Sequence, residues 1–138
     1  MQSQVIKAAP AVRPIEVVEG AYAAYGRRDL AAIAALYHPE CELYQSELLP
    51  WGGSYKGHAG LQVFFERLTG AIDTQIVDEN LFEAGDRVVS VGRTRGRALA
   101  TGATFELPAV HVYTVKDGTI RRYDAFVDTP GMLHAIGY

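Results

Sequence analysis

The stretch that decides the fold runs from Pro108 to Phe126 and reads PAVHVYTVKDGTIRRYDAF. Side chains that favour strands alternate on both sides of Asp117-Gly118. Asp-Gly is a strong hairpin signal, because glycine tolerates the positive φ that a tight turn requires. The stretch therefore predicts two antiparallel strands. It also places two titratable groups, His111 and Asp124, in strands that otherwise resemble core.

Strand-like patterns continue toward the N-terminus from this hairpin. The runs QIVDENLF, RVVSVGRTRGRALA and TFELPAVHVYTV are separated by turn residues that include Gly85 and Gly102. Together with the hairpin turn at Gly118, these breaks predict four successive antiparallel strands over residues 74–128.

Helical patterns occupy the first third of the chain. In PIEVVEGAYAAYGRRDLAAIAALY, apolar residues recur at helical spacing, and Pro14 suits the first turn of a helix. Gly26 and Asp29 indicate a break, with Asp29 capping a second helix that continues through Leu36.

The middle and the end of the chain supply the other elements. CELYQS alternates like a strand, and LPWGGSYKGHAG reads as a loop because of its proline and glycines. DTPGMLHAIG predicts a short final helix, with Thr129 as its cap and Pro130 at its first position. An amphipathic helix is predicted by one apolar stripe: Leu61, Phe64, Phe65, Leu68 and Ile72.

Helices that are segregated from an antiparallel sheet define the α+β class. We expect one domain over residues 14–138, in which a curved sheet wraps around the helices as a cone, preceded by a flexible tail over residues 1–13. Such an arrangement leaves a cavity between sheet and helices, which is the usual place for a small-molecule site.

Composition excludes several classes of function. The 138-residue chain is 49% hydrophobic and has a formal charge of −3, without a run of lysine or arginine, so no nucleic-acid partner is expected. Its single cysteine, Cys41, forms no internal disulfide and suits a reducing compartment. No signal-peptide pattern or run of 18 apolar residues occurs, so we expect a cytoplasmic protein without a membrane partner.

His111 is the first candidate for chemistry. Strand alternation puts His111, Tyr113 and Val115 on one face. A histidine there is either a core residue with satisfied hydrogen bonds or a proton-transfer group, because its ordinary pKa of about 6.5 lies close to neutrality. Burial lowers that pKa, and a nearby carboxylate raises it.

Asp124 and Asp128 lie on one face of the last predicted strand. Asp124 is read either as a site carboxylate or as a cross-strand ion-pair partner of Arg95 or Arg97. Asp128 is read either as a site carboxylate or as a cap at the start of the final helix, beside Thr129.

Aromatic residues are numerous, and each is either core or the lining of a site for a flat, apolar ligand. The set comprises Tyr22, Tyr25, Tyr37, Tyr44, Trp51, Phe64, Phe65, Tyr113 and Tyr123. Arg93, Arg95 and Arg97 alternate along one strand, as an anion-binding stripe or as a solvated face. The histidines lack metal-ligand spacing, so no metal is expected.

Three segments resemble one family: YGRRDLAAIAALYHPECELY, PWGGSYKGHAGLQVFF and ATGATFELPAVHVYTVKDGTIRRYDAFVDT. They are similar to the SnoaL-like branch of the nuclear transport factor 2-like superfamily, which also holds ketosteroid isomerase and polyketide cyclases. The resemblance covers about residues 14–138. It implies a cone with an interior pocket and homodimers formed through the outer face of the sheet.

The resemblance to the isomerase places Ala21 at its site tyrosine, Gln45 at its base aspartate and His111 near its protonated aspartate. Two of these three groups are missing, which argues against a steroid double-bond isomerase. The cyclases are closer, because they have a histidine that matches His111. Their catalytic aspartate falls at Ala125, one residue past Asp124, and a one-residue shift reverses the strand face.

These observations lead to one expected function and one alternative. The expected function is acid–base chemistry, of the cyclase or isomerase kind, on a small and largely apolar organic molecule. His111 would transfer the proton, helped by Asp124 or Asp128, without a cofactor. The alternative is a non-catalytic binding or dimerisation module on the same fold. Trp51 is expected near the pocket mouth, and the expected substrate-binding residues are Tyr25, Gln45, Trp51, Phe64, Tyr113 and Tyr123.

Overall fold

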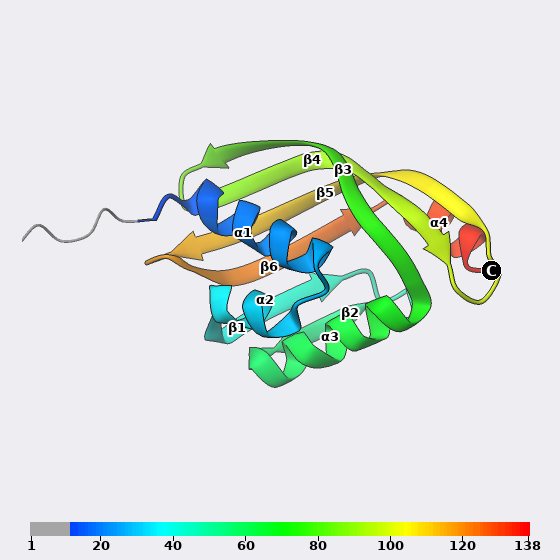
Figure 1. Ribbon diagram of the computed structural model, residues 1–138, viewed down its shortest axis with the longest axis horizontal. Helices are drawn as coiled ribbons and strands as arrows, with labels where there is room; N and C mark the ends of the chain where they lie inside the picture. Colours follow the sequence, from blue (N-terminus) through cyan, green and yellow to red (C-terminus); the bar gives the residue numbers. More distant parts are fainter. Residues whose placement is uncertain (1–11) are drawn as a thin grey trace, which may run out of the picture.

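The computed structural model describes residues 12–138 (Figure 1). For Asp78 it describes the backbone alone. The expected flexible tail falls on residues 1–13, of which 1–11 lie outside the described residues. In chain order the elements are α1 (Pro14–Gly26), α2 (Leu30–Leu36), β1 (Tyr37–Gln45), β2 (Gly53–Lys56), α3 (Gly57–Ala71), β3 (Ile72–Ala84), β4 (Arg87–Ala98), β5 (Thr104–Lys116), β6 (Thr119–Val127) and α4 (Thr129–Ala135).

A six-stranded sheet forms the frame, in the order β2-β1-β6-β5-β4-β3. Strands β3 to β6 are successive antiparallel neighbours, which confirms the prediction for residues 74–128. The hairpin turn between β5 and β6 has positive φ at Asp117 (52°) and Gly118 (77°). The pair of β1 and β6 is the exception, because these two strands run parallel.

Two details of the predicted elements are wrong. The segment after Leu49 is not all loop, since β2 pairs antiparallel with β1 at the edge of the sheet. Thr129 is not the cap of α4; the reading of Asp128 as the cap is confirmed instead, because its carboxylate accepts a hydrogen bond from the Gly131 amide at 3.0 Å. The predicted cap of α2 is confirmed, with the Asp29 carboxylate 3.0 Å from the Ala32 amide.

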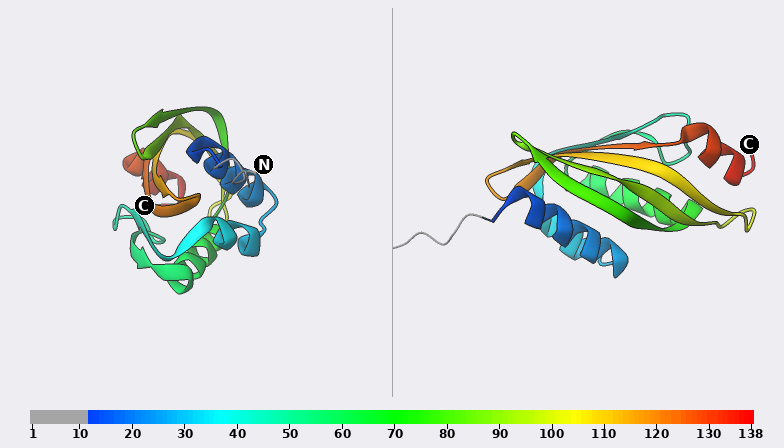
Figure 2. Two further views of the ribbon diagram at one scale, coloured as in Figure 1. Left: turned by 90° about the vertical axis from the view of Figure 1, so that its left-hand side faces the viewer. Right: turned by 90° about the horizontal axis from the view of Figure 1, so that it is seen from above.

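The sheet curls strongly, so that its concave face holds α1 on one side and α3 on the other (Figure 2). The curl brings β3 close over the inner face of β4. At Gly92 and Gly96 an added Cβ atom would collide with the backbone of β3, at Glu79 and Asp73 respectively. Two glycines in β4 therefore permit the close approach that bends the sheet into a cone.

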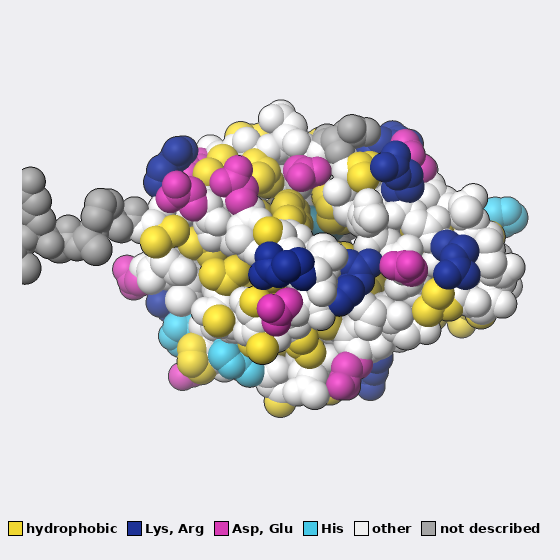
Figure 3. Space-filling view, in the orientation of Figure 1, with side chains coloured by type: hydrophobic (Ala, Val, Ile, Leu, Met, Phe, Trp, Pro, Cys, Tyr) yellow, Lys and Arg dark blue, Asp and Glu magenta, His cyan; other side chains and the backbone are white. Residues whose placement is uncertain are grey.

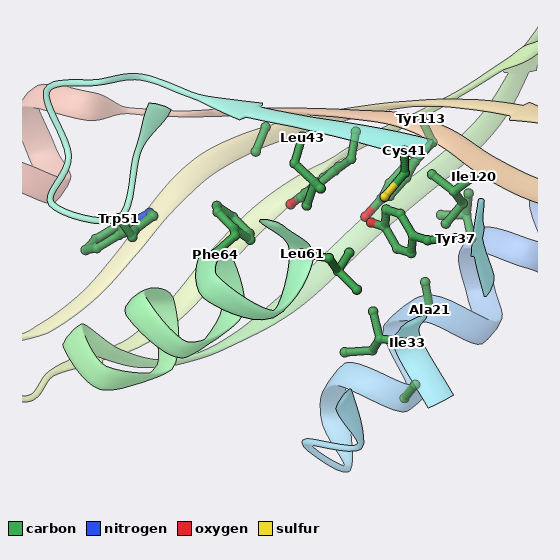
Figure 4. Close-up of a cluster of buried hydrophobic side chains, with 14 of the residues drawn as sticks. Ala21, Ile33, Tyr37, Cys41, Leu43, Trp51, Leu61, Phe64, Tyr113 and Ile120 are labelled. Carbon is green, nitrogen blue, oxygen red and sulfur yellow. The ribbon is translucent and has the colours of Figure 1, made fainter. Parts of the chain in front are cut away.

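The hydrophobic core lies between the concave face and the helices (Figure 4). The core includes side chains from the helices, from the sheet and from the segment between β1 and β2. Its largest fully buried apolar side chains are Trp51, Phe64, Leu43, Leu61, Ile120, Met132, Val18 and Val88. Among residues 12–138, no helix combines the length and apolar character that a membrane crossing requires.

Substitution of Gly96 tests the role of the close approach. We expect Gly96→Ala to lower the free energy of unfolding by about 1–3 kcal/mol, because the new methyl group overlaps backbone atoms that cannot move alone. The matched control is Gly70→Ala in α3, where an added Cβ meets nothing within 4 Å. It is expected to raise stability by about 0.5–1 kcal/mol. Equal effects of both substitutions in urea unfolding would contradict the packing argument.

The outer face of the sheet carries an apolar row across three strands. Val91 pairs with Val110, and Val110 pairs with Phe126. Val91 is 45% exposed and Phe126 is 50% exposed. Exposed contiguous apolar surface of this kind is typical of protein–protein contact.

We expect a second copy of the chain to cover this row. Light scattering at micromolar concentration should then give twice the 15.0 kDa chain mass. Val110→Glu should shift the protein toward the monomer, because it would bury a charge in the contact. A wild-type protein of 15.0 kDa under these conditions would rule out the dimer.

Candidate functional site

A pocket of about 70 Å³ lies inside the cone, between the concave face of the sheet and helices α1 to α3. Its wall contains one basic residue, His111, and no aspartate, glutamate, lysine or arginine. Aromatic rings make much of this wall, from Tyr22, Tyr25, Tyr37, Trp51, Phe64, Phe65, Tyr113 and Tyr123. The expected substrate-binding residues all lie in this wall.

Strand register decides which groups face the pocket. His111 lies opposite Ala125 in the β5–β6 pair, and both side chains line the pocket. Tyr113, two residues further along β5, points to the same side and is 3% exposed. The predicted inward face of β5 is therefore confirmed.

His111 forms a hydrogen bond with a helix that is distant in the sequence. The hydroxyl of Tyr22, in α1, lies 2.8 Å from Nδ1 of His111. The rings of Tyr113 and Tyr123 stack with their centroids 4.8 Å apart, and the Tyr123 ring meets His111 edge-on at 5.3 Å. The imidazole is thus held between a hydrogen bond on one side and an aromatic wall on the other.

Burial sets the protonation states in the pocket. Loss of solvation lowers the pKa of His111 to about 4, because the charged imidazolium is disfavoured away from water. The same loss raises the pKa of Tyr22, and it raises the pKa values of Tyr113 and Tyr123 further. At neutral pH the site therefore consists of a neutral imidazole among neutral phenols.

Gln45 and Trp51 form a second polar contact in the wall. The Trp51 indole Nε1 donates to the Gln45 side-chain oxygen at 3.1 Å, and both residues are buried. Trp51 is fully buried, so the expectation that it lies at the pocket mouth is wrong. Its hydrogen bond and the turn that follows β1 fix it in the interior wall instead.

Asp124 does not join His111. The β5–β6 pairing is regular at this position, so Asp124 stays on the outer face of the sheet, opposite Val112. Its carboxylate accepts hydrogen bonds from Arg122 at 2.9 Å, and Arg122 also bonds to Glu42. The expected help to His111 from Asp124 is therefore not supported by the geometry, nor is an ion pair of Asp124 with Arg95 or Arg97.

Asp128 and the arginine row also lie away from the pocket. Asp128 is exposed, and its carboxylate caps α4. Arg93 Nε lies 2.8 Å from Glu106, and Arg95 is 3.6 Å from the same carboxylate. The row is thus a solvated face with ion pairs. Among the described residues, no group of three or more histidine, cysteine or acidic side chains could hold a metal ion.

Comparison with known proteins places this geometry in a family. The sequence model of one protein family, the SnoaL-like domain, matches residues 18–123. The chain belongs to the SnoaL-like family. The match runs from within α1 to within β6 and includes His111, and it confirms the resemblance that the sequence motifs indicate.

Solved structures similar to this SnoaL-like protein support the same assignment. An NTF2-like protein from Burkholderia thailandensis is 32% identical, with a TM-score of 0.83 over 92% of this chain and 100% of that chain. An NTF2-like protein of unknown function from Burkholderia pseudomallei is 26% identical, with a TM-score of 0.84 over 91% and 98%. TerC, co-crystallised with polyporic acid, is 29% identical, with a TM-score of 0.83 over 91% and 98%. No curated protein matches the sequence.

Sequence reasoning did not identify Tyr22 as the partner of His111 in this SnoaL-like domain. Two signals pointed toward it. The helical stripe of α1 includes Tyr22, and the resemblance to the isomerase places a site tyrosine at the neighbouring Ala21. Adjacent positions on a helix point about 100° apart, so the rotation of α1 about its own axis decides whether residue 21 or residue 22 reaches the histidine.

The lowered pKa of His111 predicts a pH dependence of stability. Between pH 6.5 and about 4, the unfolded chain binds a proton at His111 that the folded SnoaL-like domain does not. The free energy of unfolding therefore rises with pH in this window and gains nothing from this group above it. The difference between the two pKa values corresponds to about 3 kcal/mol.

We expect His111→Gln to flatten this part of the pH profile, measured by urea unfolding at several pH values. His134→Gln is the matched control, because His134 is exposed on α4, and it should leave the profile as in the wild type. A His111→Gln profile that runs parallel to the wild-type profile between pH 4 and 6.5 would show that the histidine is not desolvated.

Proposed function

We propose that this protein binds a small, flat and largely apolar organic molecule in the pocket and moves a proton on it. His111 is the acid–base group and Tyr22 is its positioning partner. One observation carries the proposal: the 2.8 Å hydrogen bond between Tyr22 and His111 stands inside a pocket whose other lining residues carry no charge.

The hydrogen bonds of His111 support a functional role over a structural one. A core histidine satisfies both ring nitrogens within the protein, because unpaired buried polar atoms destabilise the fold. Within residues 12–138, His111 has one hydrogen bond, at Nδ1, and 8% of the residue is exposed in the pocket wall. Nε2 is therefore the atom that a ligand would meet.

The direction of the Tyr22 hydrogen bond selects what Nε2 can do. When the Tyr22 hydroxyl donates to Nδ1, Nε2 carries the proton and donates to a ligand oxygen. When Nδ1 carries the proton and donates to the Tyr22 oxygen, Nε2 has a free lone pair and acts as a base. A neutral imidazole paired with a hydroxyl thus supplies either half of an acid–base exchange without a carboxylate.

Energetics restrict the reaction that such a pair can assist. A charged imidazolium is unfavourable in the empty pocket, since burial lowers the pKa of His111 to about 4. A ketone that loses a proton from the carbon next to its carbonyl becomes an enolate, whose oxygen is negative. Attraction between this oxygen and the imidazolium offsets the cost of charging His111. General acid–base catalysis by one positioned group supplies about 10²- to 10⁴-fold.

A relative supports the class of ligand. TerC, at 29% identity, was co-crystallised with the small organic molecule polyporic acid. The aromatic wall of the present pocket suits a flat organic ligand, because ring faces pack against flat apolar surfaces.

Ligand binding without turnover is the second candidate, and a specific observation favours it. Gln45, at the position of the isomerase base, is engaged with Trp51, and the carboxylates of Asp124 and Asp128 are directed elsewhere. The pocket thus holds one imidazole and no carboxylate beside it.

Exchange of carbon-bound protons distinguishes the two candidates. With 2-tetralone, a flat bicyclic ketone, in D₂O, we expect the wild-type protein to accelerate deuterium incorporation next to the carbonyl, followed by NMR. His111→Phe keeps a flat ring but has no nitrogen, and it should lose the acceleration, by about 10²- to 10⁴-fold at most.

Asp124→Asn is the matched control and should exchange like the wild type, because Asp124 lies on the outer face. Binding of 2-tetralone without accelerated exchange would reject catalysis and support the binding module. Equal acceleration by wild type and His111→Phe would reject His111 as the acid–base group.

A further inference from the structure

The Tyr25 hydroxyl is a buried polar atom without a hydrogen-bond partner, and among the described residues it is the sole side-chain atom of that kind. Buried hydroxyls are nearly always paired, because an unpaired one loses its bonds to water and gains nothing in return. Tyr25 also lies in the wall of the candidate site. An unpaired donor at this place requires an explanation.

A loose side chain does not explain it, because the ring of Tyr25 is held from two sides. The Arg28 guanidinium lies 4.2 Å above the ring centroid, and the Phe65 ring packs at 5.9 Å. Arg28 is itself anchored to β3 through Asp73 at 3.0 Å and the Thr74 carbonyl at 2.7 Å. The structure therefore holds the ring of Tyr25 at the edge of the pocket, with a buried hydroxyl whose hydrogen bond is unused.

Tyr25 also stands between the pocket and two grooves on the surface. One groove, of about 320 Å³, lies beside Arg28 and Phe65, and the other, of about 200 Å³, lies between α1 and β3. Hydrophobic side chains show in the hollow on this side of the molecule (Figure 3). The pocket itself has a volume of about 70 Å³, and Tyr25 lines it as well as both grooves. A bicyclic ligand needs more room, and adjoining space lies beyond Tyr25.

We infer that Tyr25 is a second ligand-binding residue, whose hydroxyl donates a hydrogen bond to an oxygen of the ligand. This inference rests on the proposed function. Tyr22 and Tyr25 are three residues apart in α1, so their side chains project from one face of the helix. The site would thus select a neutral, flat molecule with two oxygen functions, one held at His111 and Tyr22 and the other at Tyr25.

Tyr25→Phe tests the inference first without any ligand. Removal of a hydroxyl that has no partner should leave the thermal unfolding temperature unchanged or raise it. Tyr22→Phe is the matched control on the same helix face, and it should lower that temperature because it breaks the hydrogen bond to His111. A fall in Tyr25→Phe as large as in Tyr22→Phe would overturn the inference, since the hydroxyl would then have a partner within the protein.

The second arm compares two ligands that differ by one oxygen. We expect the wild type to bind 6-hydroxy-2-tetralone about three- to tenfold more tightly than 2-tetralone, by calorimetry, because one further neutral hydrogen bond is formed. In Tyr25→Phe this ratio should fall to about one. The ratio cancels any loss of contacts that both ligands share.

A ratio that is the same in wild type and Tyr25→Phe would overturn the role of Tyr25 and leave the proposed function intact. Failure of the wild type to bind either ketone would contradict the proposed function, and this inference with it. The unfolding temperatures report on the unpaired hydroxyl independently of both ligands.

Discussion

The register of the β5–β6 hairpin is the constraint on which the candidate site depends. Side chains alternate along a strand, so the pairing of His111 with Ala125 sends one titratable residue inward and keeps Asp124 outward. The turn at Asp117 and Gly118 begins the pairing, and a register shift between Thr114 and Val115 then places Ala125, rather than Asp124, opposite His111. A shift by one residue would exchange an uncharged aromatic interior for one with a carboxylate facing it.

The same interior serves as core and as pocket wall. Phe64 and Tyr113 belong to the buried cluster that stabilises the fold, and they also line the cavity. Desolvation by this shared wall explains why His111 is neutral and why the tyrosines stay protonated. Stability and reactivity are therefore coupled, because a substitution that admits water changes both.

Much of the fold could be predicted from local patterns. The alternation in residues 74–128, the Asp-Gly turn and the Asp29 cap each depend on neighbours in the sequence, and the structure confirms them. Strand β2 was missed, because an edge strand of four residues leaves no periodic signal. Both Asp128 and Thr129 were read as caps of α4, because both are good caps and local sequence does not separate them; the structure selects Asp128.

The site was less predictable, because its contacts depend on how distant elements pack. Alternation correctly placed His111 on the inner face, but its contact with Tyr22 spans 89 residues and follows from the roll of α1. Trp51 was expected at a mouth because it lies among glycines, whereas its indole is buried by a hydrogen bond to Gln45. The unpaired hydroxyl of Tyr25 has no counterpart in the sequence pattern at all.

The central claim is that a desolvated, neutral imidazole lies in the pocket with Nδ1 engaged and Nε2 available. An NMR titration of the His111 ring, with ¹⁵N-labelled histidine, measures this most directly. We expect His111 to titrate with a pKa of about 4, and Nδ1 to be the nitrogen whose signal changes in Tyr22→Phe. A pKa of His111 near the ordinary value of 6.5, with the signals of both ring nitrogens unchanged in Tyr22→Phe, would contradict this claim.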